Sequence, residues 1–235
     1  MSKPLFAIIA AMQPELDYLL DQLQQRNDIV MGAFKFHVGK IDQCDVVLAL
    51  SGIGKVNAAV TTAIVIERFA PQYVINTGSA GGLGQGMQIG DVVIGTEVAH
   101  HDVDVTAFGY DIGQVPQLPS RYHSAQSLIQ AAKLAVKESN HQHGIHQGLI
   151  VSGDQFIGTA EQNQRITNNF PDVLAVEMEA AAIAQTCHQL SVAFVIIRAI
   201  SDNGDAHASI SFDEFLQVAG KNSAKMVINL INSLS

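Results

Sequence analysis

The sequence predicts an α/β fold, a three-layer αβα sandwich around a central mixed β-sheet. Short apolar runs typical of buried strands alternate along the chain with segments whose apolar residues recur at helical spacing. Two neighbouring strands are expected at residues 34–41 and 44–50, separated only by Asp42 and Gln43. This short connection indicates a β-hairpin, so the sheet is expected to contain antiparallel as well as parallel pairs.

Composition restricts the class of protein. The 235 residues are 48% hydrophobic and 15% charged, which supplies a large core, and no Pro- or Ser-rich linker divides them. We therefore expect one domain over residues 1–235. The net charge of −9 disfavours a nucleic-acid partner, because phosphate binding needs clustered Lys and Arg.

The predicted location is the cytoplasm. Cys44 and Cys187 are the only cysteines and do not form a C-x-x-C pair, which favours a reducing compartment. Residues 1–11 superficially resemble a short signal peptide, but Gln13 and Pro14 interrupt the apolar run, and we expect a buried strand instead. No apolar run approaches the roughly 18 residues of a membrane-spanning helix, so no membrane partner is expected.

The first third of the chain predicts a strand at 5–10 and a helix whose first turn contains Pro14. Glu15 then lies just beyond the carboxyl end of a strand, where open α/β sheets usually bind their ligands. Residues 51–55 are expected to lead into a second helix. The predicted apolar face of that helix comprises Val56, Ala59, Val60, Ala63 and Ile64.

The middle of the chain predicts a strand at 73–77, followed by the glycine-rich run 78–82, whose backbone a ligand can approach closely. Strand-rich sequence follows at 89–106. We then expect a long loop at 108–119, a helix at 125–138 and a strand at 148–152.

Two carboxylates stand at a predicted junction between a strand at 173–176 and a helix at 180–189. A buried carboxylate without partners is expensive, so Glu177 and Glu179 are expected to have a partner or a chemical task. The alternative is that they are first-turn acids that complement the helix dipole. From this segment alone both interpretations stay open.

The last third predicts a strand at 193–200 and a long C-terminal helix. The strand carries Arg198 and runs into Ser201 and Asp202. Ser211 and Glu214 have the spacing of a capping box, which would begin the helix. The expected apolar face of this helix comprises Phe212, Phe215, Leu216, Ala219, Val227, Leu230 and Ile231.

Histidines give little support for a metal site. His100 and His101 precede Asp102, but adjacent residues of a strand point to opposite faces of the sheet. The histidines between 141 and 146 are more typical of a solvated turn than of a ligand set. We expect no metal.

Polar or aromatic residues follow several predicted strands directly, and one crevice would collect them: Glu15, Ser79, Phe156, Glu179 and Asp202. Carboxylates without metal-type spacing suit acid–base work on a group that leaves after protonation, through a cationic intermediate. Glycosyl cleavage fits this description. Phe156 would offer a flat face to an aromatic leaving group.

Six segments together resemble a known family, that of the 5'-methylthioadenosine/S-adenosylhomocysteine nucleosidases, and the resemblance runs essentially end to end. The segments are residues 51–56, 76–82, 104–110, 151–154, 176–180 and 198–202. This family belongs to the nucleoside phosphorylase/hydrolase group, whose fold is a three-layer αβα sandwich. The resemblance implies hydrolysis of 5'-methylthioadenosine and S-adenosylhomocysteine to adenine plus 5-methylthioribose or S-ribosylhomocysteine.

The resemblance implies a role for each matching residue. Asp202 would be the general acid that protonates N7 of adenine, with Ser201 orienting it. Glu15 would position and deprotonate the attacking water, beside Ser79 and Arg198.

Further residues would bind the nucleoside itself. Glu179 would accept hydrogen bonds from the ribose hydroxyls, and Met178 would pack on the sugar. Phe156 would stack on adenine, while the backbone of Ile157 would bind the Watson–Crick edge of the base. The ribose and 5'-alkylthio side would be lined by Met12, Ile53 and Phe212.

The resemblance also implies a homodimer, in which Val105, Phe108 and Pro116 complete the pocket of the neighbouring subunit. The partners would be an adenine nucleoside thioether and water, with no cofactor. Two segments depart from the family pattern, Gln13-Pro14 and residues 203–207 after Asp202. These departures affect the local charge and the segment before Phe212.

Three alternatives remain at the level of the sequence. A purine nucleoside phosphorylase would need arginines for phosphate, and Arg198 alone is expected near the site. The same residues would also support hydrolysis of 5'-deoxyadenosine or aminodeoxyfutalosine. A non-enzymatic nucleoside sensor is disfavoured, since Glu15 and Asp202 are both present.

Overall fold

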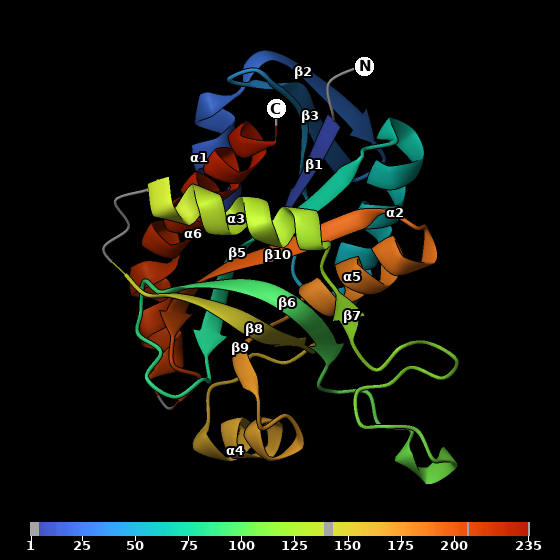
Figure 1. Ribbon diagram of the computed structural model, residues 1–235, viewed down its shortest axis with the longest axis vertical. Helices are drawn as coiled ribbons and strands as arrows, with labels where there is room; N and C mark the ends of the chain where they lie inside the picture. Colours follow the sequence, from blue (N-terminus) through green and yellow to red (C-terminus); the bar gives the residue numbers. More distant parts are fainter. Residues whose placement is uncertain (1–4, 139–142, 206, 235) are drawn as a thin grey trace.

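The structure, a computed structural model, describes residues 5–138, 143–205 and 207–234 of the chain. Within them, ten strands form a single mixed β-sheet (Figure 1). The strands are β1 Leu5–Ala10, β2 Gln24–Met31, β3 Phe34–Ile41, β4 Cys44–Leu50, β5 Tyr73–Gly82, β6 Val92–His100, β7 Tyr122–His123, β8 Ile145–Ser152, β9 Val173–Glu177 and β10 Ala193–Asp202.

One half of the sheet is open and the other half closes on itself. The open half runs from β5 through β1, β4 and β3 to β2 at the edge. In the closed half, β5 pairs in parallel with β10 and, at Gly81 and Gly82, antiparallel with β9. The pairs β10–β6, β6–β8 and β8–β9 complete a ring of five strands. The expected β3–β4 hairpin is confirmed, with Ile41 opposite Cys44.

Helices cover both faces of the sheet, which confirms the three-layer sandwich. Alternate residues of β1 separate the two cores, since Phe6 and Ile8 pack with α1, α3 and α6 whereas Ala7 and Ile9 pack with α2 and α5. In Figure 1, α1 and α6 lie on one side of β5 and β10, and α2 and α5 on the other. The helices are α1 Gln13–Gln22, α2 Lys55–Phe69, α3 Gln126–Glu138, α4 Ala160–Asn169, α5 Ala180–Gln189 and α6 Ala208–Ser233, with a 3₁₀ turn η1 at Thr106–Phe108.

The face of α2 that packs on the protein differs from the predicted one. Val56 and Val60 are 73% and 41% exposed. The buried residues of α2 are Ala58, Thr61, Thr62, Val65 and Ile66. Helix α5, against which α2 packs, is rich in alanine. In the first part of α2 the buried side chains Ala58, Thr61 and Thr62 are small, which allows close packing on α5 and leaves Val56 and Val60 on the exposed side.

Helix α6 begins earlier than predicted. Its first residue is Ala208, and the backbone N–H of Ser211 donates to the carbonyl of His207 at 3.0 Å, so Ser211 lies inside the helix. Asp205 causes the earlier start, because its side chain accepts from His207 N and its carbonyl accepts from Ala208 N. The capping box expected at Ser211 and Glu214 was therefore wrong.

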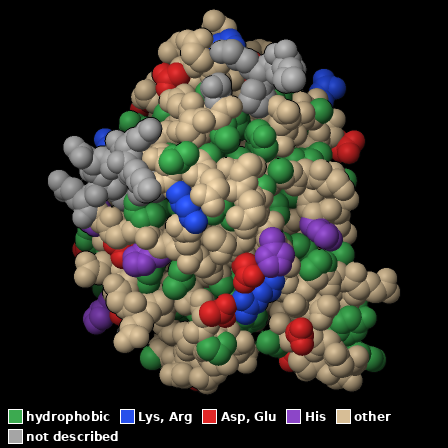
Figure 2. All heavy atoms as spheres, viewed as in Figure 1, with side chains coloured by type: hydrophobic (Ala, Val, Ile, Leu, Met, Phe, Trp, Pro, Cys, Tyr) green, Lys and Arg blue, Asp and Glu red, His purple; other side chains and the backbone are tan. Residues whose placement is uncertain are grey.

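The described helices include none that is both long and apolar enough to cross a membrane. On the face drawn in Figure 2, acidic and basic side chains are interspersed, and the basic ones stand apart from one another.

Candidate active site

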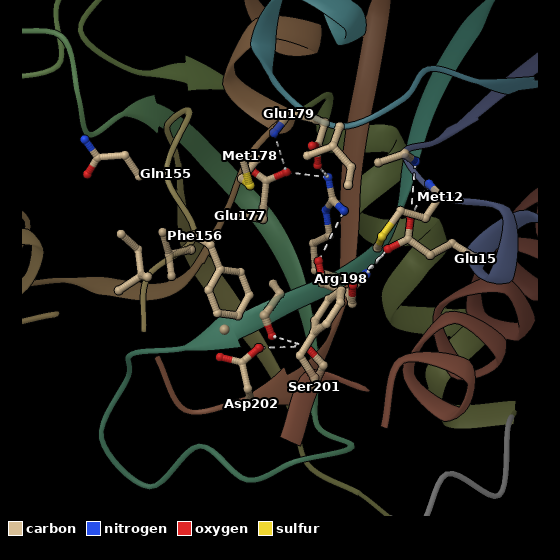
Figure 3. Close-up of a pocket in the computed structure, with 18 residues that line it drawn as sticks. Met12, Glu15, Gln155, Phe156, Glu177, Met178, Glu179, Arg198, Ser201 and Asp202 are labelled. Atoms are coloured by element: carbon tan, nitrogen blue, oxygen red, sulfur yellow. Dashed lines mark hydrogen bonds and ion pairs between the residues drawn. The ribbon is translucent and has the colours of Figure 1, made fainter. Parts of the chain in front are cut away.

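A pocket of about 240 Å³ lies where several strands of the sheet end (Figure 3). Its walls come from the β1–α1 junction, the ends of β5 and β10, the β9–α5 junction and the first turns of α6. The predicted site residues that line it are Met12, Glu15, Ile53, Ser79, Phe156, Ile157, Met178, Glu179, Arg198, Ser201, Asp202 and Phe212. The prediction missed the lining residues Ala11, Ala80, Gly81, Gln155 and Val176, and it left open the role of Glu177, which also lines the pocket.

Glu15 is held by four hydrogen bonds in the first turn of α1. Its Oε2 accepts from the backbone N–H groups of Ala11 and Met12, both at 3.1 Å. Its Oε1 accepts from the backbone N–H and the hydroxyl of Ser79 at 2.9 and 2.8 Å. The side chain is buried. All four groups donate to the carboxyl group, which suits an ionised carboxylate acting as acceptor only.

Arg198 extends from β10 into the same region and is 1% exposed. Its Nη2 donates to Asn76 Oδ1 at 2.7 Å, to Glu179 Oε2 at 3.3 Å and to Glu177. Its Nη1 donates to the carbonyl of Ser79 at 3.2 Å. Both terminal nitrogens of the guanidinium are therefore engaged with the protein, and the charge is balanced by two carboxylates.

The carboxylate of Glu177 stabilises the junction between β9 and α5. Its carboxylate accepts from the backbone N–H groups of Glu179 and Ala180 at the start of α5, from Ser152 Oγ and from Arg198. These bonds satisfy backbone donors at the helix N-terminus, where a negative charge is also favoured by the helix dipole. Glu177 ends β9 and so lies before the first turn of α5, but its contacts support the interpretation that it complements the start of that helix.

The side chain of Glu179 lines the pocket and has fewer hydrogen-bond partners than that of Glu177. Its Oε1 accepts from Gly54 N at 2.8 Å and its Oε2 from Arg198. Burial, together with the nearby charge of Glu177, raises the pKa of Glu179 above its ordinary value, although Arg198 opposes this shift. A carboxyl group in this position can accept hydrogen bonds from a polar ligand in the pocket.

Asp202 stands at the end of β10 with two donors from its own neighbourhood. Its Oδ2 accepts from Ser201 Oγ and its Oδ1 from Gly204 N, both at 2.9 Å. Burial raises the pKa of Asp202 above its ordinary value, and the two hydrogen bonds offset only part of that rise. Asp202 is therefore placed to keep a proton at a higher pH than an exposed aspartate.

Aromatic rings form one wall of the pocket. Phe156 is 45% exposed, and its ring meets that of Phe212 edge to face, with centroids 5.7 Å apart. Figure 3 shows Phe156 on the same side of the pocket as Asp202, with Glu15 and Arg198 across from it. We call Glu15, Ser79 and Arg198 the Glu15 side, and Asp202, Ser201, Phe156 and Ile157 the Asp202 side.

Three predicted site residues lie outside the pocket of their own chain. Val105, Phe108 and Pro116 belong to the loop between β6 and β7, and none of them lines the pocket. Phe108 is 81% exposed. This placement is compatible with a role in a neighbouring subunit, which stays a prediction.

Among the residues that the structure describes, no group of three or more His, Cys, Asp and Glu side chains is arranged to hold a metal ion. His100 pairs with Gln185 at 2.9 Å, and His146 pairs with Asp91 at 3.0 Å. His141 lies outside the described residues.

The pocket thus combines a fixed carboxylate, a buried acid of raised pKa and an aromatic wall. The family model of the phosphorylase superfamily matches residues 5–232. The chain accordingly belongs to this superfamily, as the closed sheet and the position of the pocket lead one to expect.

Relatives define the family more narrowly. A 5'-methylthioadenosine/S-adenosylhomocysteine nucleosidase of Exiguobacterium is 50% identical over 227 residues, which cover 97% of each chain. The crystal structure of the nucleosidase of this name from Neisseria meningitidis, in complex with methylthio-immucillin-A, is 57% identical with a TM-score of 0.97, covering 98% of this chain and 100% of that one. The nucleosidase of Colwellia psychrerythraea, in complex with adenine, is 42% identical with a TM-score of 0.97, covering 99% and 96%. The chain belongs to the 5'-methylthioadenosine/S-adenosylhomocysteine nucleosidase family.

Proposed function

We infer that this chain hydrolyses the N-glycosidic bond of 5'-methylthioadenosine and S-adenosylhomocysteine. The products are adenine plus 5-methylthioribose or S-ribosylhomocysteine. The observation that carries this function is the pair of buried carboxyl groups on two sides of one pocket. Glu15 is surrounded only by donors, whereas burial raises the pKa of Asp202. Such a pair provides a base and an acid at one pH.

The Asp202 side activates the leaving group. Adenine lies against Phe156, and the backbone of Ile157 binds its Watson–Crick edge. Asp202 gives its proton to N7, so the electron pair of the C1'–N9 bond moves to a purine that leaves as neutral adenine. Ser201 and Gly204 orient the carboxyl group through hydrogen bonds of 2.9 Å.

The Glu15 side supplies the nucleophile. Water attacks C1' of the ribosyl cation and gives a proton to Glu15, whose lone pairs are aimed by the donors of Ser79, Ala11 and Met12. Glu179 accepts hydrogen bonds from the ribose hydroxyls, and Met178 packs on the sugar. The carboxyl groups of Glu15 and Glu179 favour the positive charge that develops on the ribosyl group.

A phosphorylase reaction has little support in this pocket. Arg198 is the single arginine among the lining residues, and both of its terminal nitrogens already bind Asn76, Ser79 and two glutamates. A phosphate dianion would also lie close to the carboxylate of Glu15. Arg26 pairs with Asp28, and Arg121 pairs with Glu97 and Asp172. Arg165 bonds to Gln155 at the pocket but does not itself line it.

The 5'-substituent is the less determined part of the substrate. Met12, Ile53 and Phe212 give the pocket an apolar side that fits a methylthio group. The same residues would accept 5'-deoxyadenosine, and the catalytic groups would also act on aminodeoxyfutalosine.

The direct test is release of adenine by the purified protein in buffer that contains a chelator and no phosphate. We expect turnover of 5'-methylthioadenosine and S-adenosylhomocysteine, measured by chromatography of free adenine. 5'-Deoxyadenosine, aminodeoxyfutalosine and inosine complete the panel and rank the substrates. Adenine release that requires added phosphate would overturn the hydrolase, and binding without any turnover would indicate a nucleoside sensor.

We also propose that the chain acts in the cytoplasm as a homodimer, with residues 1–235 as one domain. Support for the dimer comes from Ile53, Val56 and Val60, which form an exposed apolar row at and beyond the pocket, and from the exposed Phe108. Support for a cytoplasmic location comes from Cys44 and Cys187, neither of which forms a disulfide within the chain.

Mixing two inactive variants tests the dimer. Glu15→Gln lacks the base but keeps Phe108, and Phe108→Ala keeps the base but cannot complete a neighbour's pocket. Hybrid dimers should recover activity in one of their two pockets. No gain over Phe108→Ala alone, after mixing by dilution from mild denaturant, would contradict the shared pocket.

A further inference from the structure

Helix α6 contacts the strands that carry Ser79 and Arg198 through a residue that does not line the pocket. Ser223 lies in α6 with none of its side chain exposed, and it does not line the pocket. Its Oγ lies 3.1 Å from Gly78 N, 2.5 Å from Thr77 Oγ1 and 3.0 Å from the carbonyl oxygen of Ile197. A hydroxyl has one proton and two lone pairs, and the carbonyl can only accept. Ser223 therefore donates to Ile197 and accepts from Gly78 N–H and Thr77 O–H, which uses its full capacity.

These bonds join two strands directly before their site residues. Gly78 precedes Ser79, whose N–H and hydroxyl donate to Glu15. Ile197 precedes Arg198 on β10, and in the β5–β10 pair Ile197 is opposite Thr77 and Arg198 is opposite Gly78. One serine thus links the backbone that presents Ser79 to the backbone that presents Arg198.

The atoms around Gly78 leave no room for a side chain at this position. A Cβ atom at this position would lie 2.5 Å from Arg198 Nη1 and 2.7 Å from Glu15 Oε1. The guanidinium of Arg198 and the carboxylate of Glu15 therefore both lie close to the backbone of Gly78, in the space that a side chain would occupy. A small displacement of Gly78 would carry the two donors of Ser79 away from Glu15.

The same face of α6 also touches the backbone of Glu15. Gly220 lies three residues before Ser223, so the two residues share a helix face. A Cβ atom on Gly220 would lie 3.0 Å from Glu15 Cα and 3.1 Å from the carbonyl oxygen of Pro14. The closeness of α6 to α1 at this point depends on the missing side chain.

We propose that Gly220 and Ser223 are positioning residues, which set the mutual placement of Glu15, Ser79 and Arg198 without touching the substrate. This inference rests on the hydrolase function proposed above. One face of α6 contacts each of the three segments that carry these groups, namely the start of α1, the middle of β5 and the middle of β10. The reaction needs the attacking water to be held within a fraction of an ångström, so a loosened segment lowers turnover more than binding.

The test is Ser223→Ala, with Ser124→Ala as the matched control. Ser124 is also buried, and its hydroxyl donates to a strand carbonyl, that of Gly95, at 2.6 Å. Like Ser223, it does not line the pocket. For Ser223→Ala we expect kcat to fall roughly 10- to 100-fold, while KM and the dissociation constant of adenine change by less than about twofold. Ser124→Ala should keep the wild-type kcat.

A double mutant separates positioning from general loosening of the fold. If Ser223 acts through the donors of Ser79, the losses of kcat in Ser223→Ala and Ser79→Ala overlap, and the double variant loses less than their product. Losses that multiply, or a folded Ser223→Ala protein with kcat within about twofold of wild type, would overturn the proposal. A wild-type protein that releases no adenine would instead remove the proposed function itself.

Gly220→Ala provides an independent variant should Ser223→Ala fold poorly. Alanine favours helices more than glycine, so helix propensity alone predicts an unchanged or higher unfolding midpoint. We nevertheless expect kcat to fall, because the new methyl group pushes on Glu15 Cα and Pro14. An unchanged kcat in this variant would count against positioning by α6.

Discussion

The two sides of the pocket hold their carboxyl groups in different ways. Glu15 receives four hydrogen bonds, two from the start of α1 and two from Ser79 on β5. Asp202 receives two, from Ser201 and Gly204, which are its near neighbours in sequence. The position of Glu15 is fixed by local donors together with Ser79, which is 64 positions away in sequence, whereas burial lets Asp202 keep a proton. A base needs direction and an acid needs its proton, so the difference matches the two tasks.

Replacing Glu15 should have the largest effect, since it removes both the base and an acceptor of four donors. For Glu15→Gln we expect kcat to fall by roughly 10² to 10⁴. Because an amide NH₂ must now face backbone or hydroxyl donors, we also expect the free energy of unfolding to drop by about 1–3 kcal/mol. Chromatographic adenine release and urea unfolding measure the two effects. Wild-type turnover in the variant would refute the role of Glu15.

Replacing Asp202 should separate activity from stability. Asp202→Asn cannot give up a proton, so we expect a loss of kcat of roughly 10² to 10⁴. In the wild type the native state keeps the Asp202 proton above the ordinary pKa of 3.8, while the unfolded state loses it, so this group lowers stability as the pH rises toward the native pKa. An asparagine at this position has no titratable proton, so it does not cause this loss of stability with rising pH.

Urea unfolding at pH 4 and pH 7 measures this difference. We expect the stability of Asp202→Asn relative to wild type to increase from pH 4 to pH 7. The opposite trend would mean that Asp202 is ionised in the native protein, and the contrast between the two sides would then disappear.

Replacing Phe156 should have the smallest effect of the three, because stacking contributes to binding but moves no proton. Phe156→Ala should weaken binding of adenine by about 1–3 kcal/mol, the usual contribution of a base stacked on an aromatic ring. Isothermal titration with adenine measures it, and Phe156→Tyr serves as a control that keeps the flat ring. Equal affinity of the alanine variant and wild type would exclude stacking at this position.

Most strands and the acids that follow them could be predicted from the sequence. Strands β1, β4, β9 and β10 are apolar enough to stand out. Glu15 and Glu179 lie shortly after β1 and β9, and Asp202 is the last residue of β10. Strand β2 was missed, because its sequence QQRNDIVM belongs to an edge strand exposed on most of its length and shows no alternation.

Two other features depend on contacts that no local pattern records. Strand β5 continues to Gly82, whereas the predicted strand ended at residue 77, because residues 78–81 pair with β10 and Gly81 and Gly82 pair with β9. Asn76 bonds to Arg198 across 122 positions of sequence, and Ser152 to Glu177 across 25. The supporting groups Asn76 and Ser152 were therefore missed, while the acids Glu15, Glu179 and Asp202 that face the pocket were found.

The closed half of the sheet determines where the molecule can open. A strand within a ring has a neighbour on both sides, so it cannot peel away from an edge, and amide hydrogens of β5 and β10 should exchange with solvent only when the ring breaks as a unit. The ring closes at Gly81 and Val176, which both line the pocket. Strand β2, by contrast, pairs only with β3 and can fray alone. We therefore expect local opening of the sheet at β2, whereas the strands that carry Ser79 and Arg198 should open only together with the ring.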